Sequence, residues 1–371
     1  MIDDALTYRI AFSSLRSLTP ALAGAVLDRV GSEENFFSLT ESQLSAAMGF
    51  ANRLFKSSVR DEALERARTE TTFVESNSIT TLYFRDPGYP RRLLECDDAP
   101  LMLYGLGDCN FNESRCISIV GTRHATAYGV EFVDRLVEGL STLLPEKPII
   151  VSGLAYGIDI AAHRAALSVG LPTVAVLAHG LSTIYPSQHR QVAVDMVRRN
   201  GMLLTDYHSS SPVHKGNFLA RNRIIAGLAD ALIVVESASK GGALVTARLA
   251  AGYNRDVFAL PGRISDKYSV GCNGLIAGHI AGVITSAADL CEQMGWQTVS
   301  TDDQASQPSL FPQLSPEEEM IVDILTERGE ASLPELSARI DMPTSRLMAM
   351  LIDMEFRSLL INIPGGRYRL R

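Results

Sequence analysis

The most concentrated set of chemically active side chains lies in the stretch KGNFLARNRIIAG, residues 215–227. Lys215 and Phe218 stand in the loop and first turn of an apolar helix. A cation and an accessible ring beside the free N–H groups of a helix start suit a phosphate and the face of a nucleobase. Ordinary packing is the competing interpretation of Phe218.

Two arginines follow in the same helix. Arg221 and Arg223 lie two residues apart, roughly 200° around a helix, so they cannot share one face. We expect one of them to tether the domain through an ion pair and the other, with Asn222, to reach the surface. Asp206 and Glu236 follow predicted strands nearby, and we interpret them as structural carboxylates that pair with these arginines.

Short loops rich in small residues follow several β-branched runs: Gly121-Thr122-Arg123, Ser152–Gly157, Glu236–Gly242 and Pro261-Gly262-Arg263. Ligands of an open parallel sheet bind outside the carboxyl ends of its strands, so these loops predict a single phosphate-binding edge. Neither a G-x-G-x-x-G nor a P-loop spacing occurs, and a dinucleotide site is therefore not indicated. Taken alone, Gly153 and Gly157 are what a tight strand-to-helix turn requires.

The elements that must position these loops follow a regular alternation. Six short apolar runs alternate with segments of helical period, which predicts βαβ units in a doubly wound, Rossmann-like parallel sheet. The predicted strands are 117–120, 149–151, 173–177, 202–205, 231–235 and 257–260. The helix after the first strand has a clear apolar stripe of Val133, Leu136, Val137, Leu140 and Leu144.

The rest of the chain predicts flanking units of other kinds. Residues 1–75 have helical spacing with a Gly31 stop and predict a helical domain of the sterile-alpha-motif or helix-hairpin-helix type, followed by a connector rich in Pro, Asp and Gly at 76–116. The α/β domain occupies 117–298. A polar, aperiodic linker at 299–314 leads to 315–371, where three helices and a Gly-tipped hairpin predict a winged helix.

Composition bounds the class of protein. The chain has 371 residues, 46% of them hydrophobic, enough for more than one domain. No run is long and apolar enough to cross a bilayer, and the first twenty residues do not have the pattern of a signal peptide, so we expect a cytoplasmic location. The 5 cysteines have no C-x-x-C spacing, and the histidines have no ligand spacing, which leaves no argument for a metal.

Charge is distributed unevenly. The net charge is −8, but residues 117–298 carry 15 Lys and Arg against 13 Asp and Glu, and this block alone is positive. Residues 315–371 carry 7 Lys and Arg against 10 Asp and Glu, which argues against a strong duplex-binding role for the winged helix, and its partner stays open between DNA and protein. Local potential decides phosphate binding, so an acidic protein with one basic edge is compatible with a nucleic-acid ligand.

Six motifs in order resemble one family. They are SIVGTRHATAYG (118–129), SGLAYGIDIAAHRAAL (152–167), KGNFLARNRIIAGLADALIVVE (215–236), GGALVTARLA (241–250), VFALPG (257–262) and GCNGLI (271–276). Together they resemble the DNA-processing protein DprA (Smf) family, closely over the α/β block and loosely over both flanking units.

The resemblance implies a function without catalysis and without a cofactor. Family members bind single-stranded DNA, protect it during natural transformation and load the RecA recombinase onto it, and a homodimer through the last part of the α/β block is expected. The residues that the resemblance assigns to DNA are Gly121, Thr122, Arg123, Lys215 and Phe218, and more weakly Asn222 and Arg223, together with the loop Lys240, Gly241 and Gly242. Two positions depart from the usual family pattern, namely Leu219 in place of Pro, and Lys240-Gly241-Gly242-Ala243 in place of Ser-Gly-Ser.

An enzyme is the alternative. Lysine-decarboxylase-like phosphoribohydrolases share the strand-helix pattern and require P-G-G-x-G-T-x-x-E. Aligned on Gly241-Gly242, that motif places Leu244, Val245 and Arg248 at its Gly, Thr and catalytic Glu. Because a cation cannot replace that carboxylate, the pattern favours the binding protein.

Overall fold

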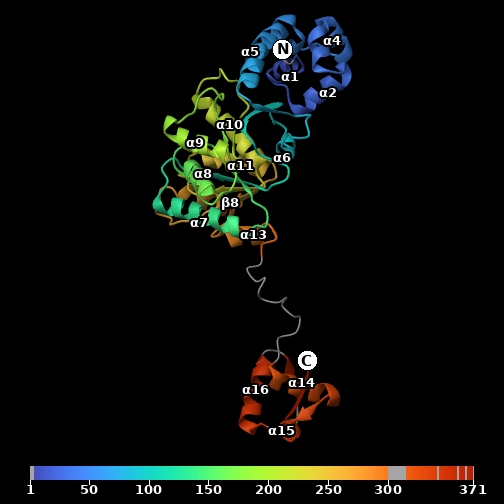
Figure 1. The fold of residues 1–371 in the computed structure, drawn as a ribbon, viewed down its shortest axis with the longest axis vertical. Coiled ribbons are helices and arrows are strands. Elements are labelled where there is room, and N and C mark those ends of the chain that lie inside the picture. Colours follow the sequence, from blue (N-terminus) through green and yellow to red (C-terminus); the bar gives the residue numbers. More distant parts are fainter. Residues whose placement is uncertain (1–3, 300–314, 341, 357–358, 364–365, 371) are drawn as a thin grey trace. The chain divides into compact units, whose positions relative to one another are not determined.

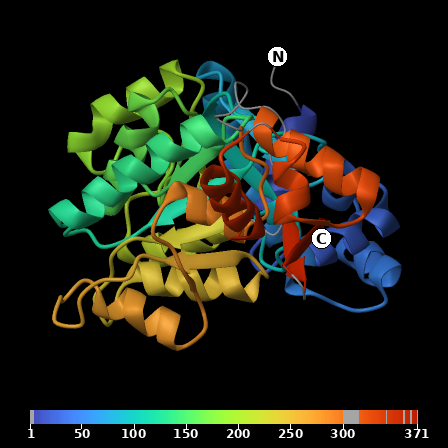
Figure 2. The ribbon, with the colours of Figure 1, turned by 90° about the horizontal axis from the view of Figure 1, so that it is seen from below.

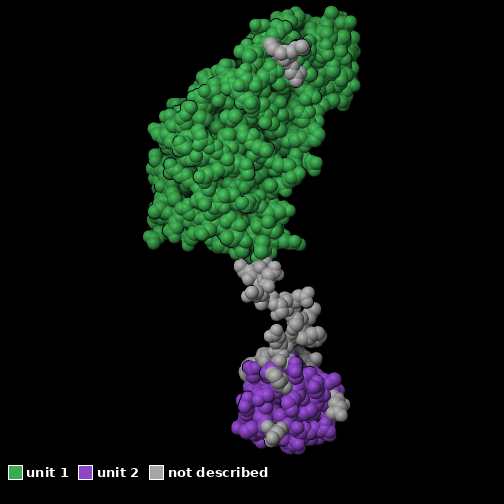
Figure 3. Space-filling model, viewed as in Figure 1, with its two compact units in different colours: residues 1–299 green, residues 300–371 purple. Residues whose placement is uncertain are grey.

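The computed structural model describes residues 4–299, 315–340, 342–356, 359–363 and 366–370. The chain divides into two compact units, residues 1–299 and 300–371 (Figure 3). The predicted linker at 299–314 falls outside the described residues except for Val299. Within the ranges that are described, no helix combines the length and apolar character needed to cross a membrane.

A nine-stranded sheet forms the centre of the first unit, with the order β1-β2-β6-β5-β4-β3-β7-β8-β9. All neighbouring pairs from β6 to β9 are parallel. These strands are β3 (Cys116–Val120), β4 (Ile149–Ser152), β5 (Thr173–Val176), β6 (Met202–Thr205), β7 (Ala231–Val234), β8 (Asp256–Ala259) and β9 (Gly282–Val283). The predicted α/β fold is confirmed. It could be predicted because parallel strands are buried on both faces and therefore need continuous apolar runs in the sequence.

The predicted connector at 76–116 contributes two strands to this sheet, so its description as a plain connector is wrong. β1 (Thr80–Tyr83) pairs antiparallel with β2 (Met102–Gly107), which pairs antiparallel with β6. The glycines of β2 interrupt the apolar pattern by which a strand is identified in a sequence. A Cβ atom at Gly105 would lie 2.7 Å from Met202 Sδ, so the glycine is required by close packing within the sheet.

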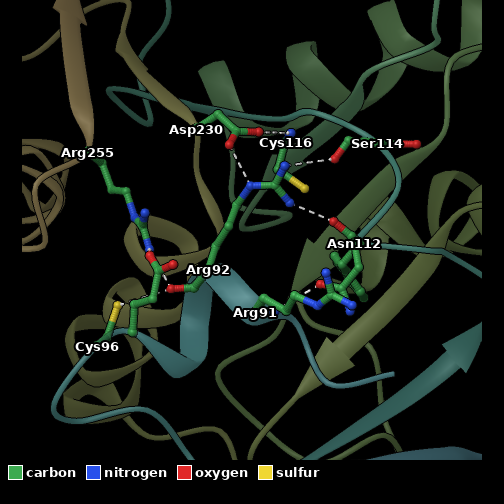
Figure 4. A network of polar contacts seen from close by, with 10 residues as sticks. Arg91, Arg92, Cys96, Asn112, Ser114, Cys116, Asp230 and Arg255 are labelled. Carbon is green, nitrogen blue, oxygen red and sulfur yellow. Dashed lines mark hydrogen bonds and ion pairs between the residues drawn. The ribbon is translucent and has the colours of Figure 1, made fainter. Parts of the chain in front are cut away.

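A polar network fastens this added segment to the domain core (Figure 4). Arg92, in α6 (Arg91–Leu94), donates through Nε to Asp230 at 2.5 Å and also to the carbonyls of Phe111 and Ser114. Asp230 in turn accepts from the Cys116 N–H at 2.8 Å. The Arg92 guanidinium, a planar donor that suits several acceptors, therefore connects α6 to Asp230 just before β7, and Asp230 connects both to the start of β3.

Helices cover both faces of the sheet (Figure 2). One face carries α7 (Ala127–Leu143), α8 (Ile158–Ser168), α9 (Arg190–Arg198) and α13 (Ala287–Gln293), and the other carries α10 (Lys215–Leu228), α11 (Gly242–Gly252) and α12 (Val270–Ala277). Alternate residues of β3 enter different cores, since Ile117 and Ile119 pack under α7 whereas Cys116 and Val120 pack toward α10 and α11.

Five helices precede the sheet and lie together at one end of the first unit (Figure 1). They are α1 (Asp4–Ser13), α2 (Pro20–Val30), α3 (Glu33–Ser38), α4 (Glu41–Met48) and α5 (Ser57–Ser76), with the short 3₁₀ turn η1 (Arg53–Phe55) before α5. Gly31, with φ of 90°, ends α2 as predicted. Their core is continuous with that of the sheet, and buried Glu70 of α5 accepts from the N–H and hydroxyl of Ser209.

In its described residues, the second unit contains three helices and a small antiparallel sheet ordered β10-β12-β11. The elements are α14 (Pro316–Arg328), β10 (Ala331–Ser332), α15 (Leu333–Ser337), α16 (Thr344–Phe356), β11 (Leu360–Ile363) and β12 (Arg367–Leu370). Ser315 and Ser332 form capping boxes with Glu318 and Glu335. These are the elements expected of a winged helix, and that assignment stays a prediction. Arg367 of the expected wing pairs with Glu330 and Glu335.

A buried histidine gives the first unit a specific pH dependence. His163 is fully buried, and its Nδ1 lies 2.7 Å from Thr173 Oγ1, which donates its own proton to the carbonyl of Ile150. The imidazole is therefore neutral with its proton on Nδ1, and Nε2 has no protein partner. Burial lowers the pKa of His163 from 6.5 to about 3.

We predict that acid weakens this unit through His163. Between pH 6.5 and about 3 the unfolded chain binds a proton that the folded chain excludes, so the free energy of unfolding falls as pH falls, by at most about 1.4 kcal/mol per pH unit. His163→Asn keeps a donor toward Thr173 without titrating and should flatten this dependence. Urea unfolding followed by fluorescence of Trp296, the 1 tryptophan of the chain, measures it. Thr173→Val, which retains the histidine, should keep the wild-type slope, and equal slopes for wild type and His163→Asn would refute the prediction.

Candidate nucleic-acid interface

The candidate site lies where the winding of the sheet reverses. β3 is flanked by β4 on one side and β7 on the other, so the chain leaves β3 in one direction and returns to its other side. Loop 121–126 follows the carboxyl end of β3, and loop 235–241 follows the carboxyl end of its neighbour β7. The Thr122 N–H donates to the Glu236 carbonyl at 2.7 Å, which joins the two loops at the position where open α/β sheets bind ligands.

Close backbone approach explains the glycines around loop 121–126. A Cβ atom at Gly121 would lie 2.5 Å from Ile158 Cγ1, and one at Gly157, where φ is 76°, would lie 2.2 Å from the Thr122 carbonyl oxygen. The Ile158 N–H donates to that carbonyl at 3.1 Å. The start of α8 is thus pressed against the loop, and Arg123 is left exposed at its outer side.

An aromatic cluster lies under Arg123. Its guanidinium carbon is 5.3 Å from the centroid of the Phe218 ring, a cation–π arrangement. The Phe218 ring is half-buried and meets Tyr185 edge-on at 5.8 Å. Tyr185 is 43% exposed and comes from the loop after β5. Phe218 is therefore not part of the buried core, although its contact with Tyr185 is also what ordinary packing would give.

Lys215 completes what we call the Arg123 cluster, namely Arg123, Lys215, Phe218 and Tyr185. Lys215 is the first residue of α10 and stands three positions before Phe218, so both project from one side of the helix. The preceding residue, His214, caps the helix by accepting the Gly216 N–H at 3.2 Å. Lys215 is exposed and has no carboxylate partner among the described residues, so its ammonium group is available to an anion.

Both arginines of α10 are bound to other groups of the protein, Arg221 in the interior and Arg223 with 21% of its side chain exposed. Arg221 is 4% exposed and donates to the carbonyls of Gly153 and Val176. Arg223 pairs with Asp206 and also donates to the Asp98 carbonyl. The predicted DNA contact of Arg223 is therefore poorly supported, since its guanidinium is already bound.

Only one of the two predicted structural carboxylates pairs with an arginine. Asp206 holds Arg223, and burial raises the pKa of Asp206 against the opposing effect of that guanidinium. Glu236 instead accepts from the Thr126 N–H at 2.9 Å and from the Thr126 hydroxyl at 2.5 Å, at the start of α7. A carboxylate stabilises a helix N-terminus, so Glu236 fixes α7 against the end of β7.

The remaining predicted contacts gather at the start of α11. Asn222 is 9% exposed, and its side-chain amide lies 3.5 Å from the Gly242 carbonyl, so it contacts the start of α11. Lys240 and Gly241 are exposed, and Lys240 has no carboxylate partner in the described part of the chain. The structure therefore divides the predicted residues into a set that is exposed or half-buried and a pair bound within the protein, Asn222 and Arg223.

Sequence reasoning missed Tyr185. Its signal was its place after β5, because every strand-to-helix loop of a parallel sheet reaches the same edge. The interpretation needed the spatial order of the strands as well, since Tyr185 and Phe218 are far apart along the chain. Across the described ranges, no group of three or more His, Cys, Asp or Glu could hold a metal ion.

Comparison with known proteins gives consistent matches. The model of the family described as DNA recombination-mediator protein A matches residues 80–295. Protein Smf of Synechocystis is 31% identical over the full length of both chains. DNA processing protein A of Streptococcus pneumoniae has a similar structure, with a TM-score of 0.65 and 32% identity, over 77% of this chain and 97% of that one.

One further solved structure concerns a ligand. It is described as giving insights into the single-stranded DNA binding mode of DNA processing protein A from Helicobacter pylori. Its TM-score is 0.51 at 30% identity, and the match covers 58% of this chain and 95% of that one.

Proposed function

This chain belongs to the DNA recombination-mediator protein A family, and from that membership we propose that it binds single-stranded DNA along the edge formed by the Arg123 cluster and loop 235–241. The single observation that supports this most is the contact between the Arg123 guanidinium and the half-buried Phe218 ring. A cation and a ring face side by side are what a phosphate and an unstacked base require.

The available charges fit a phosphate backbone. Arg123, Lys215 and Lys240 are exposed and lack carboxylate partners among the described residues, while the neighbouring acids Asp206 and Glu236 are occupied internally. Each phosphate that such a cation neutralises adds affinity that falls with salt. Gly121, Gly241 and Gly242 have no side chain to keep a strand away from the backbone, and the N–H groups at the start of α11 favour phosphate, whereas the Thr122 N–H is bound to the Glu236 carbonyl.

The same geometry favours a single strand over a duplex. A base must be unstacked and unpaired to lie against Phe218 or Tyr185, and in B-DNA both faces of each base are already covered. The chain as a whole has a net charge of −8, which opposes a wide, stiff polyanion more than a strand that touches one basic edge.

A nucleotide hydrolase is less well supported. The position that would carry its catalytic carboxylate is Arg248, an exposed cation. Of the acids at this edge, Asp206, Glu236 and buried Asp159 are each bound within the protein, which leaves the exposed Asp266. The proposed role is therefore binding without catalysis.

A recombination mediator must hand its strand to a recombinase, so we extend the proposal to RecA as the protein partner and to a homodimer formed through the last part of the α/β block. Two apolar residues are exposed there, Val270 and Val283, at 43% and 41%, and such a contact would cover them. Sedimentation equilibrium tests it, and a monomer at all concentrations would exclude it.

Strand preference is the test of the proposed function. In fluorescence anisotropy with a labelled oligothymidine, we expect tight binding. The logarithm of the binding constant should fall linearly with the logarithm of salt concentration, with a slope of about 0.7 per phosphate contact. An unlabelled duplex of equal length should compete poorly. Equal competition by duplex would refute single-strand binding, and release of a free base from a nucleotide would support the hydrolase.

A further inference from the structure

A second feature with ligand chemistry borders loop 121–126. It is a cavity of about 840 Å³, lined by Thr126 and Tyr128 of α7 and its cap, by Glu236, and by Arg263, Lys267 and Tyr268 of the segment after β8. That volume lies in the range of about 300–1,000 Å³ typical of small-molecule pockets. None of these residues belongs to the Arg123 cluster.

Hydrogen bonds from three elements fix the walls of this cavity. The Tyr128 hydroxyl donates to the Pro261 carbonyl at 2.8 Å, and the Ser237 N–H donates to the Tyr268 carbonyl at 2.6 Å. The Asn273 side chain of α12 bonds both the N–H and the carbonyl of Gly262. Segment 261–269 is thereby attached to α7, to loop 235–241 and to α12, so the cavity is preformed.

Rings and cations continue from the Arg123 cluster into the cavity. His124 directly follows Arg123, and its ring is almost parallel to the Tyr268 ring, at 23° and 6.1 Å between centroids. The Lys267 ammonium lies 5.3 Å from the centroid of the same ring. An aromatic surface beside a cation therefore occurs twice on this edge, once on each flank of the exposed loop.

The charges around the cavity favour an anion at its mouth. Arg263 and Lys267 are exposed and have no carboxylate partner among the described residues. Two acids face the same space. Glu236 has both oxygens bound by Thr126, and Asp266 is exposed and lies 3.5 Å from the Ser265 hydroxyl. Two free cations flank one free carboxylate, so phosphate at the outer wall meets net positive charge.

We propose that this cavity is a second nucleotide subsite of the same strand, in which a base stacks on Tyr268 and His124 while Arg263 and Lys267 contact the adjoining phosphates. The inference rests on the proposed single-strand binding, and it adds where a second nucleotide binds and along which path the strand runs. The strand crosses the Gly121–Thr126 loop, from Phe218 on one flank to Tyr268 on the other. Stacking tolerates every base, so the subsite adds affinity without sequence preference.

Strand length separates this subsite from the primary one. We would titrate the full chain and its variants Tyr268→Ala and Lys267→Glu with labelled oligothymidines of increasing length. Each variant should bind the shortest oligothymidine that wild type still binds with wild-type affinity, and should bind a longer strand more weakly. The expected loss is about 5- to 100-fold for Tyr268→Ala, as for one stacked base, and about 10- to 100-fold for Lys267→Glu, which reverses a phosphate contact. Tyr268→Phe, which keeps the ring, should restore the long-strand affinity.

The matched control for the charge change is Arg198→Glu. Arg198 is exposed at the end of α9, which runs back to the opposite edge of the sheet, and this variant should bind all lengths like wild type. If Tyr268→Ala and Lys267→Glu also bind every length like wild type, while Arg123→Glu and Lys215→Glu lose binding, the second subsite is refuted and the proposed function stands. If none of the four variants changes binding, the primary site is refuted as well.

Discussion

Reversing the charge at Arg123 and Lys215 together should reduce the affinity for single-stranded DNA by at least about 100-fold. A charged hydrogen bond contributes about 1.5–3 kcal/mol, and about 1.4 kcal/mol is tenfold in affinity, so each single reversal should cost about 10- to 100-fold. Arg123→Glu has the larger effect, because it also removes the cation above the Phe218 ring. Anisotropy titrations at two salt concentrations measure both the affinity and the number of phosphate contacts.

The salt dependence identifies the cause of this loss. Each lost phosphate contact should lower the slope of log affinity against log salt by about 0.7. Arg123→Gln and Lys215→Gln should lower the slope without the added repulsion of a carboxylate. Arg198→Glu, at the opposite edge of the sheet, makes the same change in net charge and should leave both quantities unchanged. A uniform loss in all charge-reversal variants would show that net charge, and not this edge, governs binding.

Replacing Arg221 should destabilise the first unit by about 3–5 kcal/mol, because two buried carbonyls, those of Gly153 and Val176, lose a charged donor. Burial lowers the pKa of Arg221, a sign of the cost of placing this cation inside, and buried Asp159 opposes that shift. Arg221→Met retains the apolar length of the side chain and removes its donors. Urea unfolding followed by Trp296 fluorescence isolates the first unit, since this ring packs with that unit's core.

Two variants test the reason for that loss. Arg221→Lys keeps a charge but not the planar fork that reaches both carbonyls, so it should be intermediate in stability. Arg198→Met removes an exposed arginine with no protein partner in the described ranges and should change stability by less than about 0.5 kcal/mol. Full stability of Arg221→Met would show that the buried guanidinium is dispensable.

The sequence predicts six of the seven parallel strands and the C-terminal hairpin of β11 and β12 well, but it misses the short β9 and the antiparallel strands β1 and β2. Each of the six parallel strands it identified lies within one residue of the observed bounds, because burial on both faces demands an uninterrupted apolar run. β2 escaped this rule because it contains glycines required by Met202 and by a left-handed φ at Gly107. The sequence alone does not distinguish a glycine required by packing within a sheet from a glycine required by a turn.

The candidate site shows a similar division. Arg123, Lys215 and the half-buried Phe218 were identified from the loop and the helix start in which they stand, because strand-to-helix connections converge by topology. The roles of Arg221, Arg223 and Glu236 depended on which neighbours the fold supplies at hydrogen-bond distance. Spacing could exclude a shared face for the two arginines, but it could not tell that both faces of α10 meet acceptors.

Photocrosslinking tests the central claim most directly. A thymidine strand carrying 5-iododeoxyuridine is bound to the full chain and irradiated, and mass spectrometry then identifies the linked residue. The account predicts crosslinks to Phe218 or Tyr185, whose rings lie beside Arg123 at the carboxyl edge of the sheet. Crosslinks confined to residues 315–371, with none in the loops or helix starts of the first unit, would contradict it.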